Sequence, residues 1–172
     1  DGIFDAAASD DLSGEGMQIE VLSAADTGTA HWAADLYGKL ETSGQNPVKR
    51  PFAALNTLAA RDGVLIRVTG KVARPVHILY RRAAQAADVH VHHVIRLEPG
   101  AELTLLENGG IGARSNTVTE VELGKDARFH HIASKRADDD KLGIGHVFAR
   151  VGEGALFKSF SLAVNGRIMR NE

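Results

Sequence analysis

The chain has 172 residues, 44% of them hydrophobic, which is enough for one main domain of the usual roughly 100–200 residues but short for two. Its net charge of -2, from 20 basic and 22 acidic residues spread along the sequence, excludes a broad positive field for nucleic acid or anionic lipid. Because it lacks cysteine, an apolar run of about 18 residues and a basic signal sequence, we expect a cytoplasmic protein without disulfides, thiolate ligands or a membrane span.

The first part of the chain, residues 1–62, is predicted to form a small α/β segment. Residues 17–22 alternate weakly between apolar and polar side chains, which indicates a strand. Residues 29–41 place Trp32 and Leu36 at helical spacing and therefore predict an amphipathic helix.

A second short helix is predicted over residues 52–60. These residues are rich in helix formers, they follow Pro51 directly and they end near Gly63, which suits a helix with a proline start and a glycine stop. We expect Trp32 and Phe52 to anchor the core.

From residue 63 to residue 172 the pattern changes to period-two alternation, which is typical of strands. Glycine-bearing corners recur at a nearly constant interval, and Ala101, Ala127 and Ala155 follow them at spacings of 26 and then 28 residues. One such repeat cannot close its own core, and strands that stack on their equivalents one coil away run parallel. We therefore expect a mainly β protein, a parallel β-helix (β-solenoid), whose core is truncated at its C-terminal end.

The register of the repeat places side chains of the same kind above one another. The expected inward rows are Leu97, Leu123 and Val151; Ile95, Val121 and Ala149; and Leu103, Phe129 and Phe157. The opposite face is expected to carry an alternating charge ladder of Arg96, Glu122 and Arg150, with Glu102 beside Arg128. Residues 63–80 fit as a further unit, with Ile66, Arg67 and Val68 in the places of Ile95, Arg96 and Leu97.

Five segments in order resemble the SufB/SufD family of iron–sulfur cluster assembly scaffolds, and SufD more closely than SufB. They are residues 51–68, 75–80, 92–107, 116–132 and 165–172. The corner sequences within them are common turn chemistry, so it is the order and spacing of all five that carries the resemblance.

The resemblance implies a right-handed parallel β-helix that is flanked by helical segments in the full protein. It also implies a scaffold that is not an enzyme and acts beside SufB and the ATPase SufC. The iron–sulfur cluster would be handled by the full complex, with no cofactor bound by this segment. The family's cluster-site histidine and its SufC-docking segment match no position here, so we assign no catalytic, cofactor-binding or metal-binding residue.

Three histidines within four positions are the strongest local signal for chemistry. Strand alternation puts Asp88, His90 and His92 on the outward face, where two histidines and a carboxylate could hold one metal ion. We favour a solvated polar face on a central strand. His92 aligns with Val118 and then His146, and two coils separate the histidines by about 9–10 Å, too far for one shared ion.

The remaining histidines are divided between the two faces. His93 and His131 are expected to point inward as buried, hydrogen-bonded side chains. His130 is expected to point outward, beside Thr104 and Lys158.

Two other interpretations compete with the scaffold. The first is a cupin-like metal-binding protein or metalloenzyme that uses His90 and His92, because histidines followed by a Pro-Gly corner are superficially similar to a metal-dependent jelly roll. An antiparallel jelly roll would also show the alternation, since strands separated by turns every 8–12 residues alternate as well. The acidic residues 138–140 could attract calcium, although a solvated loop is the commoner meaning.

A solenoid that ends in an unpaired strand exposes backbone donors and acceptors, so we also expect the chain to self-associate.

Overall fold

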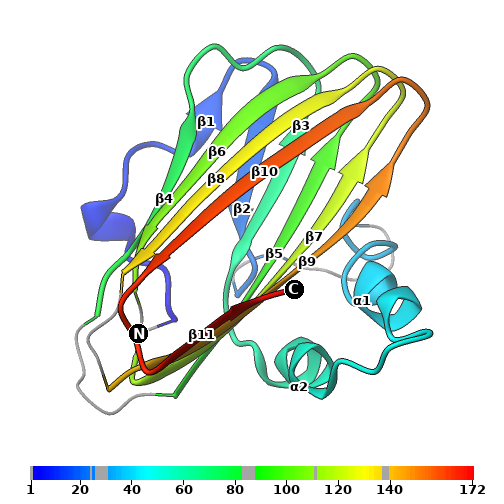
Figure 1. Ribbon diagram of the computed structural model, residues 1–172. Helices are drawn as coiled ribbons and strands as arrows, with labels where there is room; N and C mark the ends of the chain where they lie inside the picture. The colour runs from blue at the N-terminus through cyan, green and yellow to red at the C-terminus, as the bar shows by residue number, and fades with distance from the viewer. Residues whose placement is uncertain (1, 24, 26–30, 83–87, 111, 137–139) are drawn as a thin grey trace.

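The computed structural model describes residues 2–23, 25, 31–82, 88–110, 112–136 and 140–172. It is a β-solenoid, as the repeat predicts, with about four turns and two short helices. Figure 1 shows long strands winding between two sheets, with the helices on one side. The acidic residues 138 and 139 and part of the helix predicted over 29–41 lie outside the described residues.

The larger sheet, sheet A, has the order β1-β2-β3-β5-β7-β9-β11, and sheet B has the order β10-β8-β6-β4. Sheet A consists of β1 (Ser13–Gly14), β2 (Met17–Val21), β3 (Val64–Val68), β5 (Asp88–Leu97), β7 (Arg114–Leu123), β9 (Leu142–Val151) and β11 (Ile168–Asn171). Sheet B consists of β4 (Val76–Tyr80), β6 (Glu102–Gly109), β8 (Arg128–Arg136) and β10 (Leu156–Val164). From β3 onward every pairing between these strands is parallel, which contradicts the jelly-roll alternative.

The predicted register is confirmed residue by residue. Leu97 pairs with Leu123, and Leu123 pairs with Val151. The other predicted rows stack in the predicted register, including Ile95 with Val121 and Ala149, Leu103 with Phe129 and Phe157, and Ile66 with Ile95. Ala149 and Val151 keep this register, but they were expected in the core and are exposed, Val151 to 48%, because β9 is covered less than β5 and β7. Stacked leucine, isoleucine, valine and phenylalanine side chains from successive coils thus form one continuous core column.

The predicted charge ladder crosses the outer face of sheet A. Glu122 accepts from the Nε of Arg96 at 2.6 Å and also pairs with Arg150 on the next coil. Nη2 of Arg96 also lies 2.7 Å from Oδ1 of Asp35, and this ion pair connects the segment before the helices to the solenoid. Each pair is partly exposed, so it adds only about 0–1 kcal/mol, and its role is mainly to fix the register.

The corners explain why the coils stack. Gly100, Asp126 and Gly154 occupy equivalent places and all adopt the left-handed conformation, with φ of 73°, 57° and 67°. Glycine enters this region without strain and aspartate tolerates it. The N–H of Gly100 donates to the carbonyl of Lys125, and that of Asp126 to Glu153, so each corner is hydrogen-bonded to the next.

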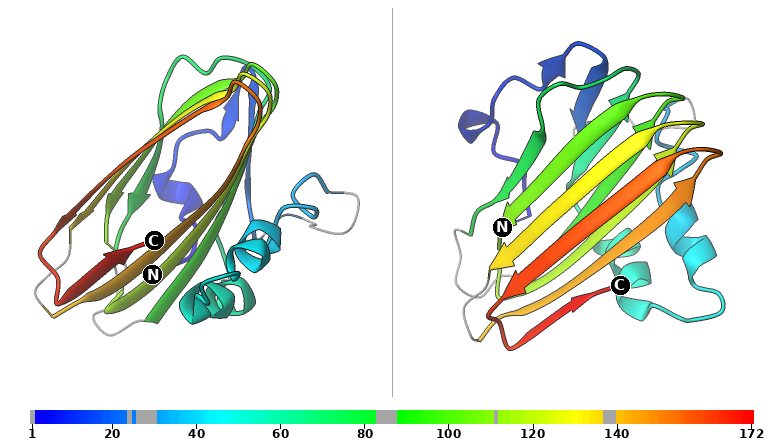
Figure 2. Two further views of the ribbon diagram at one scale, coloured as in Figure 1. Left: turned by 45° about the vertical axis from the view of Figure 1, so that its right-hand side comes forward. Right: turned by 45° about the horizontal axis from the view of Figure 1, so that its top comes forward.

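The N-terminal part covers one face of the first coils. The strand predicted at 17–22 is confirmed as β2, which pairs antiparallel with β3. The helix predicted at 52–60 is confirmed as α2 (Pro51–Ala59), with the proline in its first turn. Both α2 and α1 (Lys39–Gly44) lie against the outer face of sheet A, as Figure 2 shows.

The helix predicted over 29–41 is placed wrongly. Residues 32–38 form hydrogen-bonded turns, and the α-helix begins only at Lys39. The reason is Gly38, which adopts a left-handed φ of 71° and donates its N–H to the carboxylate of Glu120. A buried tertiary partner therefore overrides the local helical spacing.

Of the two predicted core anchors, Trp32 packs partly buried against the cluster of Ala33, Leu36 and Val94. Phe52 is wrong as an anchor, because it is 54% exposed on the solvent side of α2. The face of α2 that meets the sheet is instead formed by Ala53 and Asn56.

No helix of the described residues is long and apolar enough to cross a membrane.

Candidate functional site

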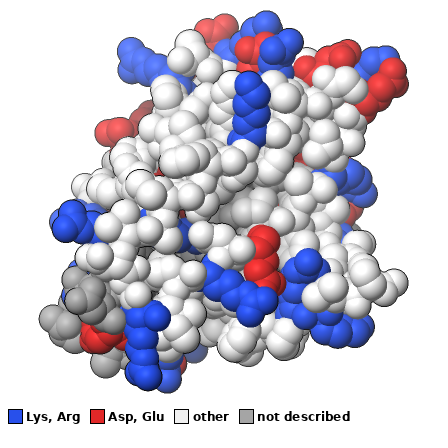
Figure 3. Space-filling model, viewed as in Figure 1, with Lys and Arg blue, Asp and Glu red and all other residues white. Residues whose placement is uncertain are grey.

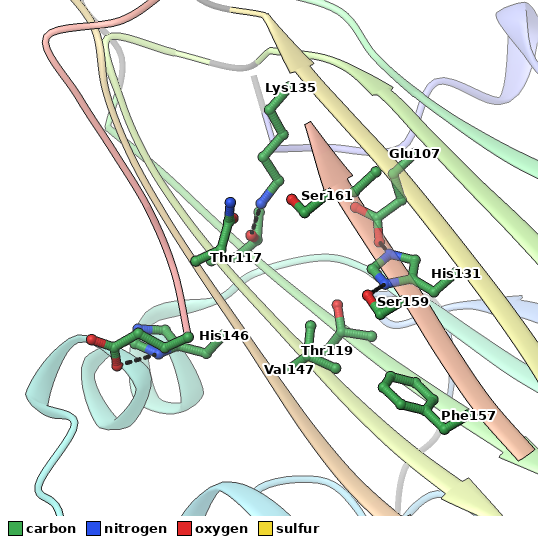
Figure 4. A pocket seen from close by; sticks show the side chains of 14 residues that line it. Glu107, Thr117, Thr119, His131, Lys135, His146, Val147, Phe157, Ser159 and Ser161 are labelled. Carbon is green, nitrogen blue, oxygen red and sulfur yellow. Dashed lines mark hydrogen bonds and ion pairs between the residues drawn. The ribbon is translucent and has the colours of Figure 1, made fainter. Parts of the chain in front are cut away.

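The lumen between the two sheets is apolar near the corners and polar toward the other end of the strands. Strand alternation turns Tyr80, His93, Glu107, His131 and Ser159 into this polar half, one from each of β4, β5, β6, β8 and β10. Figure 4 shows Glu107, His131 and Ser159 side by side across three successive strands of sheet B. The residues form one hydrogen-bonded chain along the solenoid axis.

The direction of the hydrogen bonds at one end of this chain follows from a backbone contact. The N–H of Val64 donates to Nδ1 of His93 at 3.1 Å, so the proton of a neutral His93 lies on Nε2. Nε2 therefore donates to the hydroxyl oxygen of Tyr80 at 2.7 Å. The hydroxyl of Tyr80 in turn donates to Oε2 of Glu107 at 2.9 Å.

The other end converges on the same carboxylate. Nε2 of His131 donates to Oε1 of Glu107 at 2.8 Å, and Nδ1 of His131 lies 3.1 Å from the hydroxyl of Ser159. Glu107 is thus a buried charge with donors on both oxygens, the arrangement that a low-dielectric interior requires.

This environment shifts the pKa values of three of these side chains. Burial lowers the pKa of His93 to about 4, so the ring is neutral at pH 7. Burial alone would raise the pKa of Glu107, but the hydrogen bond from His131 and the nearby positive charges lower it to about 2. Burial also raises the pKa of Tyr80 well above its usual value, and the charge of Glu107 raises it further.

A cavity of about 310 Å³ lies next to His131, at one end of this series of hydrogen-bonded side chains. Lys135 reaches across it from sheet B and donates to Oγ1 of Thr117 on sheet A at 3.2 Å (Figure 4). Gly145 leaves the space for this contact, because a Cβ there would lie 2.5 Å from the lysine nitrogen. Burial lowers the pKa of Lys135, and the charge of Glu107 partly offsets that effect.

The predictions for His93, His131 and His130 are confirmed. His93 and His131 are buried and hydrogen-bonded, while His130 is exposed and stacks between Thr104 and Lys158.

The solvated face predicted for Asp88, His90 and His92 is wrong for His92, whose side chain is fully buried. Its Nδ1 lies 3.1 Å from Oδ1 of Asn56 on α2, and its Nε2 lies 3.2 Å from Oε2 of Glu120 on β7. The ring of Tyr37 stacks on it with centroids 4.2 Å apart. The helices and the turn before them, far away in sequence, cover this part of the strand.

The same three residues do not converge on one ion. Asp88 is exposed and forms two hydrogen bonds with Arg114, His90 is half-buried, and both ring nitrogens of His92 face protein partners. His146 lies two coils from His92 in the predicted register. Within the described ranges, no group of three or more histidine, aspartate or glutamate side chains is placed to hold a metal.

Sequence reasoning overlooked Glu107, Tyr80 and Glu120. Glu107 has a visible signal, because it continues the inward alternation of Leu103 and Leu105, so a charge was predictable inside the lumen. Glu120 has none, since its partners are the backbone N–H groups of Gly38 and Glu41, at 2.6 and 2.7 Å, about 80 residues earlier.

These features define a parallel β-solenoid that holds an internal chain of titratable side chains and carries helices on one outer face. Residues 80–172, just over half of the chain, match the family model described as SUF system FeS cluster assembly, SufBD core domain. The chain therefore belongs to the SufBD core family, which links it to iron–sulfur cluster assembly. No curated protein and no solved structure matched the chain.

Proposed function

We propose that this chain is a SufD-like scaffold component that acts in a complex with a SufB-like chain and a SufC-like ATPase. In this role it presents a rigid surface to partners, catalyses no covalent chemistry itself and binds no cofactor of its own. The iron–sulfur cluster is then the cargo of the assembled complex.

The family match over residues 80–172 is the observation that carries the proposal. The internal chemistry agrees with it, because the buried polar groups of the lumen bond mainly to one another. Glu107 receives donors on both oxygens, and both nitrogens of His93 have protein partners. Because the hydrogen-bonding groups of these side chains already have protein partners, they are better suited to stabilising a scaffold than to reacting with a substrate.

The lack of cysteine also supports a scaffold that leaves the cluster to its partners, because thiolate is the usual ligand of iron–sulfur clusters. Without cysteine, a cluster bound by this chain would need a group of other ligand side chains close together.

The test is reconstitution of the complex. The tagged protein is mixed with a separately purified SufB-like chain and SufC-like ATPase from the same source. The mass of the product is then measured by size-exclusion chromatography with light scattering. We expect one complex that contains all three chains, and a protein that elutes alone would contradict the proposal.

A second measurement separates the scaffold from a metalloprotein. After anaerobic incubation with iron and sulfide, the isolated protein should hold well under one iron per chain, while the complex should hold a cluster. Stoichiometric iron on the isolated protein that is lost in a His90→Ala, His92→Ala variant would favour the cupin-like alternative.

A further inference from the structure

The outer face of sheet B differs from the outer face of sheet A in having no cover among the described residues. Helices α1 and α2 lie against sheet A. On sheet B one central row of outward side chains is apolar and open to solvent, and it includes Phe160, which is 59% exposed, and Ile132, which is 41% exposed. An exposed group of large apolar side chains on a sheet is a marker of an interaction surface.

These side chains form rows along the solenoid axis. Leu106 pairs with Ile132 and Ile132 with Phe160, so the three stack on successive coils. Leu79 and Leu162 are also exposed, and they lie at the two ends of the next row, where Asn108 and Ser134 separate them. We call this surface the apolar stripe; it consists of Leu79, Leu106, Ile132, Phe160 and Leu162.

Basic residues flank the apolar stripe on its own face. Lys158 lies two residues before Phe160, and Arg136 lies four residues after Ile132. Both are exposed, and neither forms an ion pair with any residue in the part of the chain that the structure describes. Glu102, the acidic residue on this face, is already paired with Lys71 at 2.8 Å. Figure 3 shows a largely uncharged area with lysine and arginine side chains near it.

We propose that the apolar stripe is a docking surface for an amphipathic helix of a partner protein whose apolar face is bordered by acidic residues. The rows repeat about every 4.8 Å along the axis, close to the 5.4 Å pitch of an α-helix. A helix laid along the axis can therefore place one apolar side chain per turn over successive coils. Acidic residues beside that face would meet Lys158 and Arg136.

The charge of the face argues against a second copy as the occupant. A twofold pairing brings the same surface of two chains together, and here it would oppose cations with cations. A partner that places carboxylates opposite Lys158 and Arg136 is attracted to this face instead. The proposal does not rest on the function proposed above, because it concerns a side of the solenoid that the family match leaves unassigned.

The test uses two synthetic helical peptides of about five turns with the same leucine stripe. One carries glutamates and the other lysines beside the stripe. Binding to the full chain is measured by fluorescence anisotropy at low salt. We expect the glutamate peptide to bind at least about tenfold more tightly than the lysine peptide.

Variants locate the binding site. Ile132→Asp and Phe160→Asp should each weaken the glutamate peptide at least about tenfold, because both side chains lie in the centre of the apolar stripe. Lys158→Glu should weaken the glutamate peptide and strengthen the lysine peptide. Leu58→Asp, on the solvent side of α2, removes another exposed apolar side chain and should change neither. Circular dichroism checks that each variant is folded, and Lys158→Glu keeps the test decisive if an aspartate variant unfolds.

Equal affinity for the two peptides, or binding that Leu58→Asp weakens and Ile132→Asp does not, would overturn the proposal. Binding of neither peptide but of vesicles rich in anionic lipid would assign the surface to a membrane instead. Self-association that is abolished by Ile132→Asp would assign it to a second copy.

Discussion

Glu120 and Glu122 lie two positions apart on the same face of β7, yet they have different roles. Glu120 is fully buried and accepts from the N–H groups of Gly38 and Glu41, while Glu122 is partly exposed between Arg96 and Arg150. A buried acceptor that loses a partner costs far more than a solvated one. At the scale of single residues, burial therefore decides which charge matters for stability.

We expect Glu120→Gln to lower the free energy of unfolding by about 2–3 kcal/mol, because one of its two backbone donors then loses a charged acceptor. Glu122→Gln is the matched control on the same strand and should cost less than about 1 kcal/mol. Urea unfolding followed by circular dichroism measures both. Equal losses would mean that the contact with Gly38 and Glu41 does not hold the helices in place.

The buried imidazole of His93 predicts a dependence of stability on pH. Its pKa of about 4 in the folded chain lies below the ordinary value of 6.5. Between these values the unfolded chain binds a proton that the folded chain does not, so the free energy of unfolding rises with pH. As pH falls from 6.5 to 4, we expect a loss on the order of 3 kcal/mol from this group.

Unfolding curves of wild type and His93→Gln at several pH values check this expectation. The variant should lose most of the slope between pH 6.5 and 4, whereas His130→Gln, an exposed histidine on the outer face, should keep it. Below pH 4.5 a further loss is expected as Glu107, whose pKa is lowered to about 2, is protonated. Slopes that are identical in all three proteins would show that His93 is not buried as a neutral ring.

At the scale of elements, close approach of backbones fixes how the first coil joins the second. Gly63 precedes β3, and a Cβ there would lie 1.8 Å from the carbonyl oxygen of His92. Gly100, at a corner, has open space around it but a left-handed φ of 73°. Gly63 is thus required because a side chain would collide with the neighbouring strand, and Gly100 because its backbone is left-handed.

We expect Gly63→Ala to destabilise the chain by about 3 kcal/mol or more, because β3 must move away from β5. Gly100→Ala should cost only about 1–2 kcal/mol, the strain of a left-handed residue with a side chain. Denaturant midpoints compare the two variants. A larger effect at the corner would mean that turn conformation, rather than strand contact, limits the packing of the coils.

At the scale of the whole molecule, stability is distributed along the solenoid axis. β7 pairs with β5 and β9 and is covered on one face by α2, whereas β10 pairs only with β8 in the described structure and is largely exposed. Repeat proteins gain stability from neighbouring repeats, so protection should be highest in the middle coils.

Hydrogen exchange measured by mass spectrometry tests this gradient. Amides of β5 and β7 should exchange at least about tenfold more slowly than those of β10 and β11, because they open only in larger unfolding events. Uniform protection along the axis would indicate a single cooperative unit in which the coils do not unfold separately.

The period of the repeat, the inward register and the corners follow from local sequence patterns, because alternation and turn chemistry act between residues close in the chain. Which of the outward polar residues are buried depends on segments that are far away in the sequence. His92 looks like a solvated residue in its strand, and it is covered only because Asn56, Tyr37 and Glu120 meet over it. An outward polar side chain has the same local pattern whether water or a distant helix supplies its partner, so no local signal could distinguish the two.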